Sequence, residues 1–324
     1  MLFFSLFLMA QNHSTTQEKK ISDYNFMTTS NNQHIRYGIW YSHNEKNTGA
    51  VLLLNGRKEF MEKYAETIRE LNQRGFNVYS LDWRGQGLSS RMLANRHKGF
   101  IKNYDIYLYD LNRFVIKIVQ PEASAIPLVI LAHSMGGHVA LRFIHEHPEL
   151  VDKAVLVSPM IDILTSPLPG WFVRLIARLA ILLGLDHAYI IGSGNYTVEK
   201  FKNNRLTSDP ERFMDENKAI AENPDLALGG VTYGWLSATF ESIDIITEPD
   251  FAKKITTPIL IASAGCDRVV SIKAQKVICS LLPNCRFAEI TGARHEILKE
   301  TDTIRSIFWD KFDRFTRTGI DPMH

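Results

Sequence analysis

The chain is poor in cysteine. Its 324 residues include only three, Cys266, Cys279 and Cys285. Three cysteines cannot supply the disulfide framework of a small stapled fold, and they lack the CxxC spacing and neighbouring histidines of a zinc site. We therefore expect them to be ordinary small side chains in the core or at the surface. This usage suits the cytoplasm and does not exclude other compartments.

An excess of charge of one sign is also lacking. There are 37 lysines and arginines against 35 acidic residues, which gives a formal net charge of +2. No basic stripe stands out, so we expect no nucleic acid partner. Hydrophobic residues make up 45% and charged residues 22% of the chain, as in a globular protein with a large core.

No hydrophobic run is long enough to cross a bilayer as a helix, which takes about 20 apolar residues. The N-terminal MLFFSLFLMA resembles the apolar region of a signal peptide, but no Lys or Arg precedes it. We set residues 1–22 apart as an apolar segment with a polar linker. The apolar part is either a degenerate signal or shallow membrane anchor, or a tail without fixed structure. The expected location is the cytoplasm or the inner face of a membrane, with export left open.

From Gln33 onward, strand and helix patterns alternate, which is typical of a mainly parallel sheet with helices on both faces. Several of the strand segments are continuous apolar runs, as expected for strands buried on both faces. The predicted strands are 35–41 at one edge, 50–55, 77–82, 127–133, 154–159, 257–265 and 286–290. The predicted helices are 62–73, 104–119 ending at Pro121, one that begins after 133 and ends at Pro148, 272–282 and 301–316.

The alternation is interrupted once. Residues 160–252 contain no clear strand but several helical stretches separated by Pro and Gly. A helical block within a strand–helix series predicts a cap inserted into one sheet domain. We therefore expect an α/β fold whose core is formed by 23–159 and 253–324, with 160–252 as a helical lid.

A serine lies at the junction of an apolar strand and a helix, in the sequence Ala132-His133-Ser134-Met135-Gly136. The sequence G-x-S-x-G at such a junction is typical of a nucleophile elbow, in which small residues permit a sharp turn. The turn raises the serine hydroxyl above the sheet edge where α/β proteins bind ligands. A serine that only caps the helix is the alternative. The combined strand, small residues and helix favour Ser134 as a nucleophile.

A nucleophilic serine needs a histidine to accept its proton and a carboxylate to orient that histidine. In this fold they follow the serine in the order acid, histidine. Asp267 follows the predicted strand 257–265, and His295 follows the predicted strand 286–290. Both therefore lie at the same sheet edge as Ser134. His133 and His138 are close in sequence, but we do not expect either to face the serine as a base.

The oxyanion of an acyl-transfer reaction needs two backbone N–H donors. One is expected from Met135, directly after the nucleophile. The other is expected from the loop Asn55-Gly56-Arg57-Lys58 after an upstream strand, where Gly56 permits a turn and Arg57 is the candidate. A simple turn is the alternative interpretation of this loop.

These residues occur in five motifs, which are NGRKEFMEKY (55–64), LDWRGQGLSSR (81–91), AHSMGGH (132–138), GCDRVV (265–270) and GARHEIL (292–298). Together they resemble the monoacylglycerol lipase-like serine hydrolases, of the serine aminopeptidase S33 or hydrolase-4 type, and among them the bacterial lysophospholipases most. The chain departs from the family pattern with Asn-Gly for His-Gly in the oxyanion loop and with Ala132 for Gly at the elbow.

The resemblance covers roughly 23–315 and implies a triad of Ser134, Asp267 and His295. It also implies acyl transfer without a metal or organic cofactor. The DxRGxG stretch, with Asp82, Arg84 and Gly87, is interpreted as structural support for the loop beside the site.

Within the predicted cap, 170–184 reads GWFVRLIARLAILLG, an apolar helix interrupted by Arg174 and Arg178. Such a helix either packs on the core as part of the lid or stays partly exposed as a lipid-facing gate with its arginines near anionic head groups. The two interpretations do not exclude each other.

The leading hypothesis is a carboxylic-ester hydrolase of lysophospholipid or monoacylglycerol, with peripheral membrane contact through the cap or the N-terminal segment. One alternative is a proline-type aminopeptidase, with Glu211, Asp215 and Glu216 binding the substrate amine. Another is a binding protein that keeps the fold without the chemistry. The oligomeric state is left open.

Overall fold

The computed structural model describes residues 24–44 and 48–317. Eight strands form one sheet in the order β1-β2-β4-β3-β5-β6-β7-β8. The pairs β1–β2 and β2–β4 are antiparallel, and every later pair is parallel. The strands are β1 (Asn25–Thr28), β2 (His34–Trp40), β3 (Gly49–Leu54), β4 (Phe76–Leu81), β5 (Leu128–His133), β6 (Lys153–Val157), β7 (Ile259–Ala264) and β8 (Cys285–Ile290).

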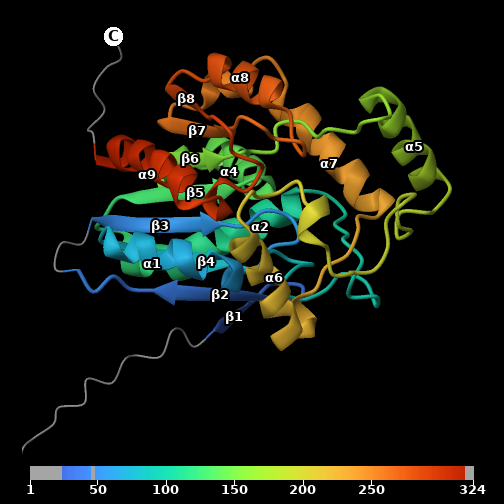
Figure 1. Ribbon diagram of the computed structural model, residues 1–324, viewed down its shortest axis with the longest axis horizontal. Helices are drawn as coiled ribbons and strands as arrows, with labels where there is room; N and C mark the ends of the chain where they lie inside the picture. Colours follow the sequence, from blue (N-terminus) through green and yellow to red (C-terminus); the bar gives the residue numbers. More distant parts are fainter. Residues whose placement is uncertain (1–23, 45–47, 318–324) are drawn as a thin grey trace, which may run out of the picture.

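Helices cover both faces of the sheet (Figure 1). Alternate residues of the central strands face opposite sides, so Leu52 and Leu54 of β3 join one core cluster while Val51 and Leu53 join the other. The first cluster includes side chains of α2 (Asp105–Phe114), α4 (Met135–Glu146) and α8 (Ile272–Leu281), and the second those of α1 (Ala65–Gln73) and α9 (Asp302–Arg317). The predicted α/β fold with two helical layers is confirmed.

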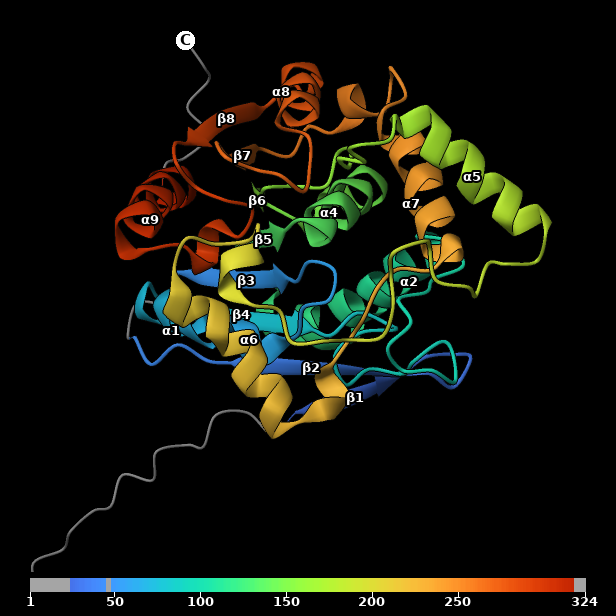
Figure 2. The same cartoon turned by 45° about the vertical axis from the view of Figure 1, so that its right-hand side comes forward.

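The segment between β6 and β7 holds three α-helices, α5 (Gly170–Leu182), α6 (Pro210–Glu222) and α7 (Tyr233–Ile246). Helix α7 packs against the core, where the hydroxyl of Thr239 lies 3.0 Å from that of Tyr104. Helix α5 packs on α7 and lies at the periphery of the molecule in both views (Figures 1 and 2). No helix in the described ranges is long and apolar enough to span a membrane.

Two predicted elements differ from the structure. The strand predicted at the edge, 35–41, is β2 and lies inside the sheet, because the short strand β1 pairs with it on the outer side. The helix predicted to stop at Pro121 continues from α2 through a π-helical turn (Val115–Val119) into α3 (Gln120–Ala123). Pro121 is tolerated because it occupies the first turn of α3, where a missing N–H costs little.

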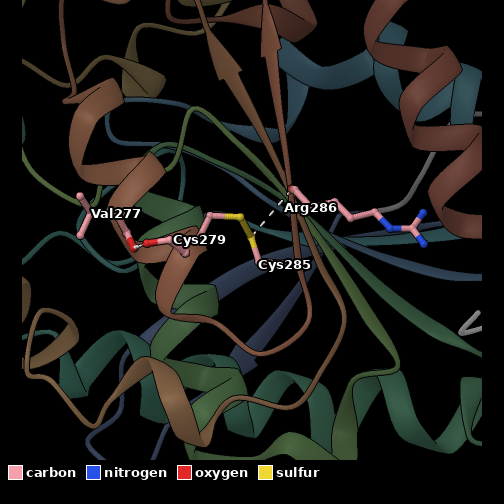
Figure 3. Close-up of a disulfide and its surroundings, with 5 residues drawn as sticks. Val277, Cys279, Cys285 and Arg286 are labelled. Atoms are coloured by element: carbon pink, nitrogen blue, oxygen red, sulfur yellow. Dashed lines mark hydrogen bonds between the residues drawn. A yellow bond between two sulfur atoms is a disulfide. The ribbon is translucent and has the colours of Figure 1, made fainter. Parts of the chain in front are cut away.

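The expectation that the three cysteines are ordinary small side chains is wrong for two of them. Cys279 of α8 and Cys285 at the start of β8 form a disulfide, with their Cα atoms 5.4 Å apart (Figure 3). The turn from helix to strand brings two cysteines six positions apart in sequence within bonding distance. Cys266 is free and exposed.

The N-terminal run assigned to a signal, anchor or tail lies outside the described residues.

Candidate active site

Ser134 occupies a strained turn between β5 and α4. Its φ of 51° and ψ of −115° place a non-glycine residue in a region that L-amino acids rarely adopt. Its N–H donates to the Val157 carbonyl of β6 at 3.0 Å. A Cβ added at Gly136 would lie 2.5 Å from the Leu54 carbonyl oxygen, so only glycine permits α4 to start this close to β3. These constraints fix the hydroxyl at the carboxyl edge of the sheet.

The three residues predicted as a triad lie in one hydrogen-bonded chain. The Ser134 Oγ is 2.9 Å from Nε2 of His295, and the His295 Nδ1 is 2.8 Å from Oδ2 of Asp267. Asp267 follows β7 and His295 follows β8, so neighbouring parallel strands bring together side chains that are far apart in sequence. The serine is 8% and the histidine 4% exposed, which shields their hydrogen bonds from water.

Two backbone amides position the Asp267 carboxylate to accept a hydrogen bond from Nδ1–H of His295. Its Oδ1 accepts the N–H groups of Val269 at 2.8 Å and Val270 at 3.1 Å. Burial works to raise the pKa of this carboxyl, but the hydrogen bond and charge of His295 and the two amides bring it below the ordinary value. The ionised carboxylate therefore orients His295 with Nε2 toward the serine.

The oxyanion loop after β3 leaves one amide free. The Gly56 N–H donates to the Glu59 carboxylate, and the Lys58 N–H donates to the side-chain oxygen of Gln86. Among the described residues, the Arg57 N–H between them has no hydrogen-bond partner. The arrangement is consistent with the prediction that Arg57 and Met135 supply the two donors. Those roles remain predictions.

Glu59 is a site residue that the sequence reasoning missed. Besides the Gly56 amide, its carboxylate accepts the Tyr64 hydroxyl at 2.6 Å and lies 3.1 Å from His133 Nδ1. The other ring nitrogen of His133 lies 3.2 Å from the backbone oxygen of His295. Glu59 and His133 thus connect the oxyanion loop to the loop that carries the triad histidine. Its place in NGR-x-E was the only available signal.

Electrostatics favour ionised partners in this buried cluster. Burial would lower the pKa of His133, but the adjacent Glu59 raises it above the ordinary value, and both ring nitrogens face acceptor oxygens. Burial would likewise raise the pKa of Glu59, yet the charges of His133 and Lys63 hold it well below its usual range. Lys63 also binds Glu296 at 2.6 Å and Glu216 of α6 at 3.0 Å. The cluster therefore extends from the site to the cap.

The two rival histidines do not face the nucleophile, as expected. His133 is engaged as described above. His138 lies 2.9 Å from the Met160 carbonyl and 2.6 Å from the Ser242 hydroxyl, and burial lowers its pKa to about 4. It is a neutral core residue that joins α4 to α7.

The DxRGxG stretch has structural contacts. Asp82 binds Arg36 at 3.0 Å and accepts backbone amides, while Arg84 forms a two-pronged ion pair with Asp110 at 2.6 and 2.8 Å. A Cβ at Gly87 would lie 2.2 Å from the Asp82 carboxylate. These contacts agree with a supporting role. Within the described ranges, no cluster of three or more potential metal ligands occurs.

The elbow, the ordered acid and histidine, and the eight-stranded sheet define an α/β-hydrolase with a serine triad. Residues 45–302 match the family model described as serine aminopeptidase, S33. The chain belongs to this family, in agreement with the resemblance stated from the motifs.

Several known proteins are similar to this chain in sequence or in structure. The chain is 32% identical over 256 residues to the probable lysophospholipase L2 of Haemophilus influenzae, and the alignment covers 79% of each protein. It is 33% identical over 265 residues to lysophospholipase L2 of Escherichia coli K12, covering 79% of this chain and 77% of the relative. A soluble variant of monoglyceride lipase from Saccharomyces cerevisiae, solved with a substrate analogue, superposes with a TM-score of 0.75 at 20% identity and covers 93% of this chain and 96% of that one.

Proposed function

We propose that this chain is a serine hydrolase that cleaves the carboxylic ester of a lysophospholipid or monoacylglycerol through an acyl-enzyme on Ser134. The observation that carries the proposal is the continuous contact from Ser134 through His295 to Asp267, at 2.9 and 2.8 Å. Nucleophile, base and orienting carboxylate are all positioned before substrate arrives, which lowers the cost of reaching the transition state.

The reaction proceeds in two halves. Ser134 Oγ attacks the ester carbonyl while its proton passes to Nε2 of His295, and the N–H groups of Met135 and Arg57 stabilise the oxyanion. Collapse expels the glycerol oxygen, which takes the proton from His295, and the acyl group stays on the serine. Water then attacks the acyl-enzyme and gives a proton to His295, which passes it to Ser134 Oγ as the fatty acid leaves.

The acidic residues required by the peptidase alternative are largely occupied. Asp215 pairs with Lys299 at 2.9 Å, and Glu216 pairs with Lys63 at 3.0 Å. Neither is an unpaired carboxylate waiting for a substrate amine. This pairing, together with relatives named lysophospholipase and monoglyceride lipase, favours a lipid ester over a peptide.

A substrate panel tests the proposal. The purified enzyme and Ser134→Ala are assayed on lysophosphatidylcholine, monoacylglycerol and a proline arylamide. We expect the wild type to release fatty acid from at least one lipid and no arylamine, and the variant to be inactive. Arylamine release alone would support the peptidase, and no activity on any substrate would support a binding protein.

We further propose that 160–252 acts as a lid and that α5 contacts a membrane. Trp171 is 69% and Leu182 is 81% exposed, and within α5 only Ala177 and Ala180 are buried. Arg174 is already paired with Asp244 at 2.6 Å, so Arg178 is the exposed cation of this helix. An apolar surface with one basic residue fits the interface of an anionic bilayer.

The Cys279–Cys285 disulfide favours a site of action in an oxidising compartment over the cytoplasm. Thiol alkylation in cells of the source, before and after reduction, tests this location. A pair that reacts only after reduction supports export, and a pair that reacts at once supports the cytoplasm or the inner face of a membrane.

A further inference from the structure

The Arg57 side chain projects from the oxyanion loop without an anionic partner. Its Nη2 donates to the Gly229 carbonyl at 2.6 Å, and the guanidinium carbon lies 5.3 Å from the centre of the Trp235 ring. The Nε is buried and has no hydrogen-bond partner. Among the described residues, Arg57 forms no ion pair with a carboxylate.

Other arginines of the chain with little exposure have more of their donors occupied, although the Nε atoms of Arg36 and Arg91 also lack a partner. Arg91 has no ion-pair partner either, but its two Nη atoms donate to carbonyl oxygens at 2.6 to 3.3 Å, supplied by Gly85, Gly87, Asp225 and Ala227. The remaining pairs are Arg36 with Asp82, Arg84 with Asp110, Arg142 with Asp105 and Arg305 with Glu66. Arg57, with a single acceptor, is therefore the arginine with the most unused donor capacity in this comparison.

The electrostatic setting of Arg57 favours an incoming anion. Burial lowers the pKa of the guanidinium to about 10, and the groups that oppose this are three tyrosines, Tyr107, Tyr104 and Tyr189, with no carboxylate among them. A partly desolvated cation without a counter-charge is unfavourable, and an anion that reaches it gains a strong, charge-assisted interaction. Arginine suits phosphate because its planar fork donates two parallel hydrogen bonds.

The position of Arg57 matches the geometry of one substrate. Its backbone N–H is the candidate oxyanion donor, so its side chain starts beside the reacting carbonyl. In a lysophospholipid, the three glycerol carbons separate the scissile ester from the phosphate. Three methylenes likewise separate the Arg57 backbone from Nε. The spacer between the carbonyl and the phosphate of this substrate is therefore similar in length to the spacer between the Arg57 backbone and its guanidinium.

We propose that the Arg57 guanidinium binds the phosphate of a lysophospholipid and so selects this substrate over monoacylglycerol. The inference rests on the proposed lipid-ester hydrolase. It assigns two tasks to one residue: the backbone amide acts on the acyl carbonyl, and the side chain recognises the head group.

The experiment measures kcat and KM on oleoyl-lysophosphatidylcholine and monooleoylglycerol, which share an acyl chain and differ at the head group. Arg57→Met keeps the backbone amide and removes the charge. We expect it to lower the ratio of kcat/KM for the phospholipid to that for the glyceride by about 10- to 100-fold, mainly through KM. Arg57→Lys should recover part of the ratio. Glycerophosphocholine should inhibit the wild type more strongly than Arg57→Met.

Arg91→Met is the matched control, because it removes a half-buried arginine whose two Nη atoms already bind backbone carbonyl oxygens. Its substrate ratio should equal that of the wild type. Equal losses on both substrates in a folded Arg57→Met enzyme would overturn the proposal and leave Arg57 with a structural role. So would a wild type that hydrolyses only the glyceride. A wild type that hydrolyses neither lipid would instead overturn the proposed function itself.

Discussion

Apolar residues are buried in the central strands beside the triad, but many are exposed in helix α5 of the cap. Every residue of β3 and β5 is buried, whereas α5 exposes large side chains such as Trp171 and Leu179. In the core, apolar side chains are buried against one another, and this packing can hold the triad residues at fixed distances. Helix α5 leaves its surface unsatisfied, which is expected of a part that completes its packing against something else. Under the proposed function, chemistry and substrate delivery thus fall to different regions.

The largest effect should come from the buried region. We expect His295→Gln to lower kcat by about 10⁴-fold or more, because the serine loses the group that takes its proton. Steady-state hydrolysis of a soluble short-chain ester measures the loss. Retention of near-normal activity in the folded variant would show that another base serves Ser134.

Glu59→Gln tests whether the ionised cluster positions the site. The amide cannot replace a carboxylate that accepts Gly56 N–H, Tyr64 and His133, so both connected loops should shift. We expect kcat to fall by about 10²-fold, the effect of a displacement on the order of 1 Å, with KM changed less. Glu62→Gln, three positions further along the chain and paired with Arg36 outside the cluster, is the control. A Glu59→Gln enzyme that loses only thermal stability would show a purely structural role.

Polar substitution of Trp171, Phe172 and Leu175 in α5 should separate the two regions. We expect about 10-fold lower hydrolysis of long-chain lipid in anionic vesicles, from weaker partition to the surface. Hydrolysis of a soluble short-chain ester should stay unchanged because the triad is untouched. Vesicle co-sedimentation and the two assays measure these effects. A variant that hydrolyses the long-chain lipid in vesicles as fast as the wild type would contradict the role of α5 at the membrane.

Reduction of the disulfide should affect stability more than chemistry. Replacing both Cys279 and Cys285 by alanine should lower the free energy of unfolding by about 2 kcal/mol, as a short closed loop predicts. Denaturant unfolding measures the loss, and kcat should match the wild type at a temperature where both are folded. A large drop in kcat would mean that the turn into β8 controls the His295 loop.

The smallest effect concerns how the cap is held. Arg212 of α6 binds Glu66 of α1 at 2.7 Å, and this hydrogen bond is the main cause that lowers the pKa of Glu66 to about 2. A carboxyl with a depressed folded pKa stabilises the fold above its unfolded value and loses that contribution as the pH falls. Amide exchange of α6 should therefore accelerate between about pH 4.5 and 2. If amide exchange of α6 changed with pH in the same way in the wild type and in Glu66→Gln, the result would contradict a role of the Arg212–Glu66 pair in holding α6.

Much of the fold was predictable because its determinants are local. Apolar runs such as 50–55 and 127–133 mark the buried strands, and the strand-to-helix junction marks Ser134. Asp267 and His295 were predictable because parallel strands place the residues that follow them at one edge. The strand β1 escaped prediction because its four residues, mostly exposed, carry almost no pattern.

The missed features depend on contacts between distant segments. Glu59 and His133 are 74 positions apart, and nothing in either local sequence says that they meet. The pairing of Cys279 with Cys285 depends on how sharply the chain turns from α8 into β8. The unpaired state of Arg57 likewise appears only once the surrounding cap residues, Gly229 and Trp235, are placed.

The central claim is that Ser134 is the nucleophile of a lipid-ester hydrolase. Peptide mapping by mass spectrometry, after reaction with a long-chain fluorophosphonate, tests it most directly. We predict one adduct, on the peptide that contains Ser134, which forms more slowly in the presence of lysophosphatidylcholine and disappears in Ser134→Ala. An adduct on a different residue, or labelling that persists in Ser134→Ala, would contradict the account.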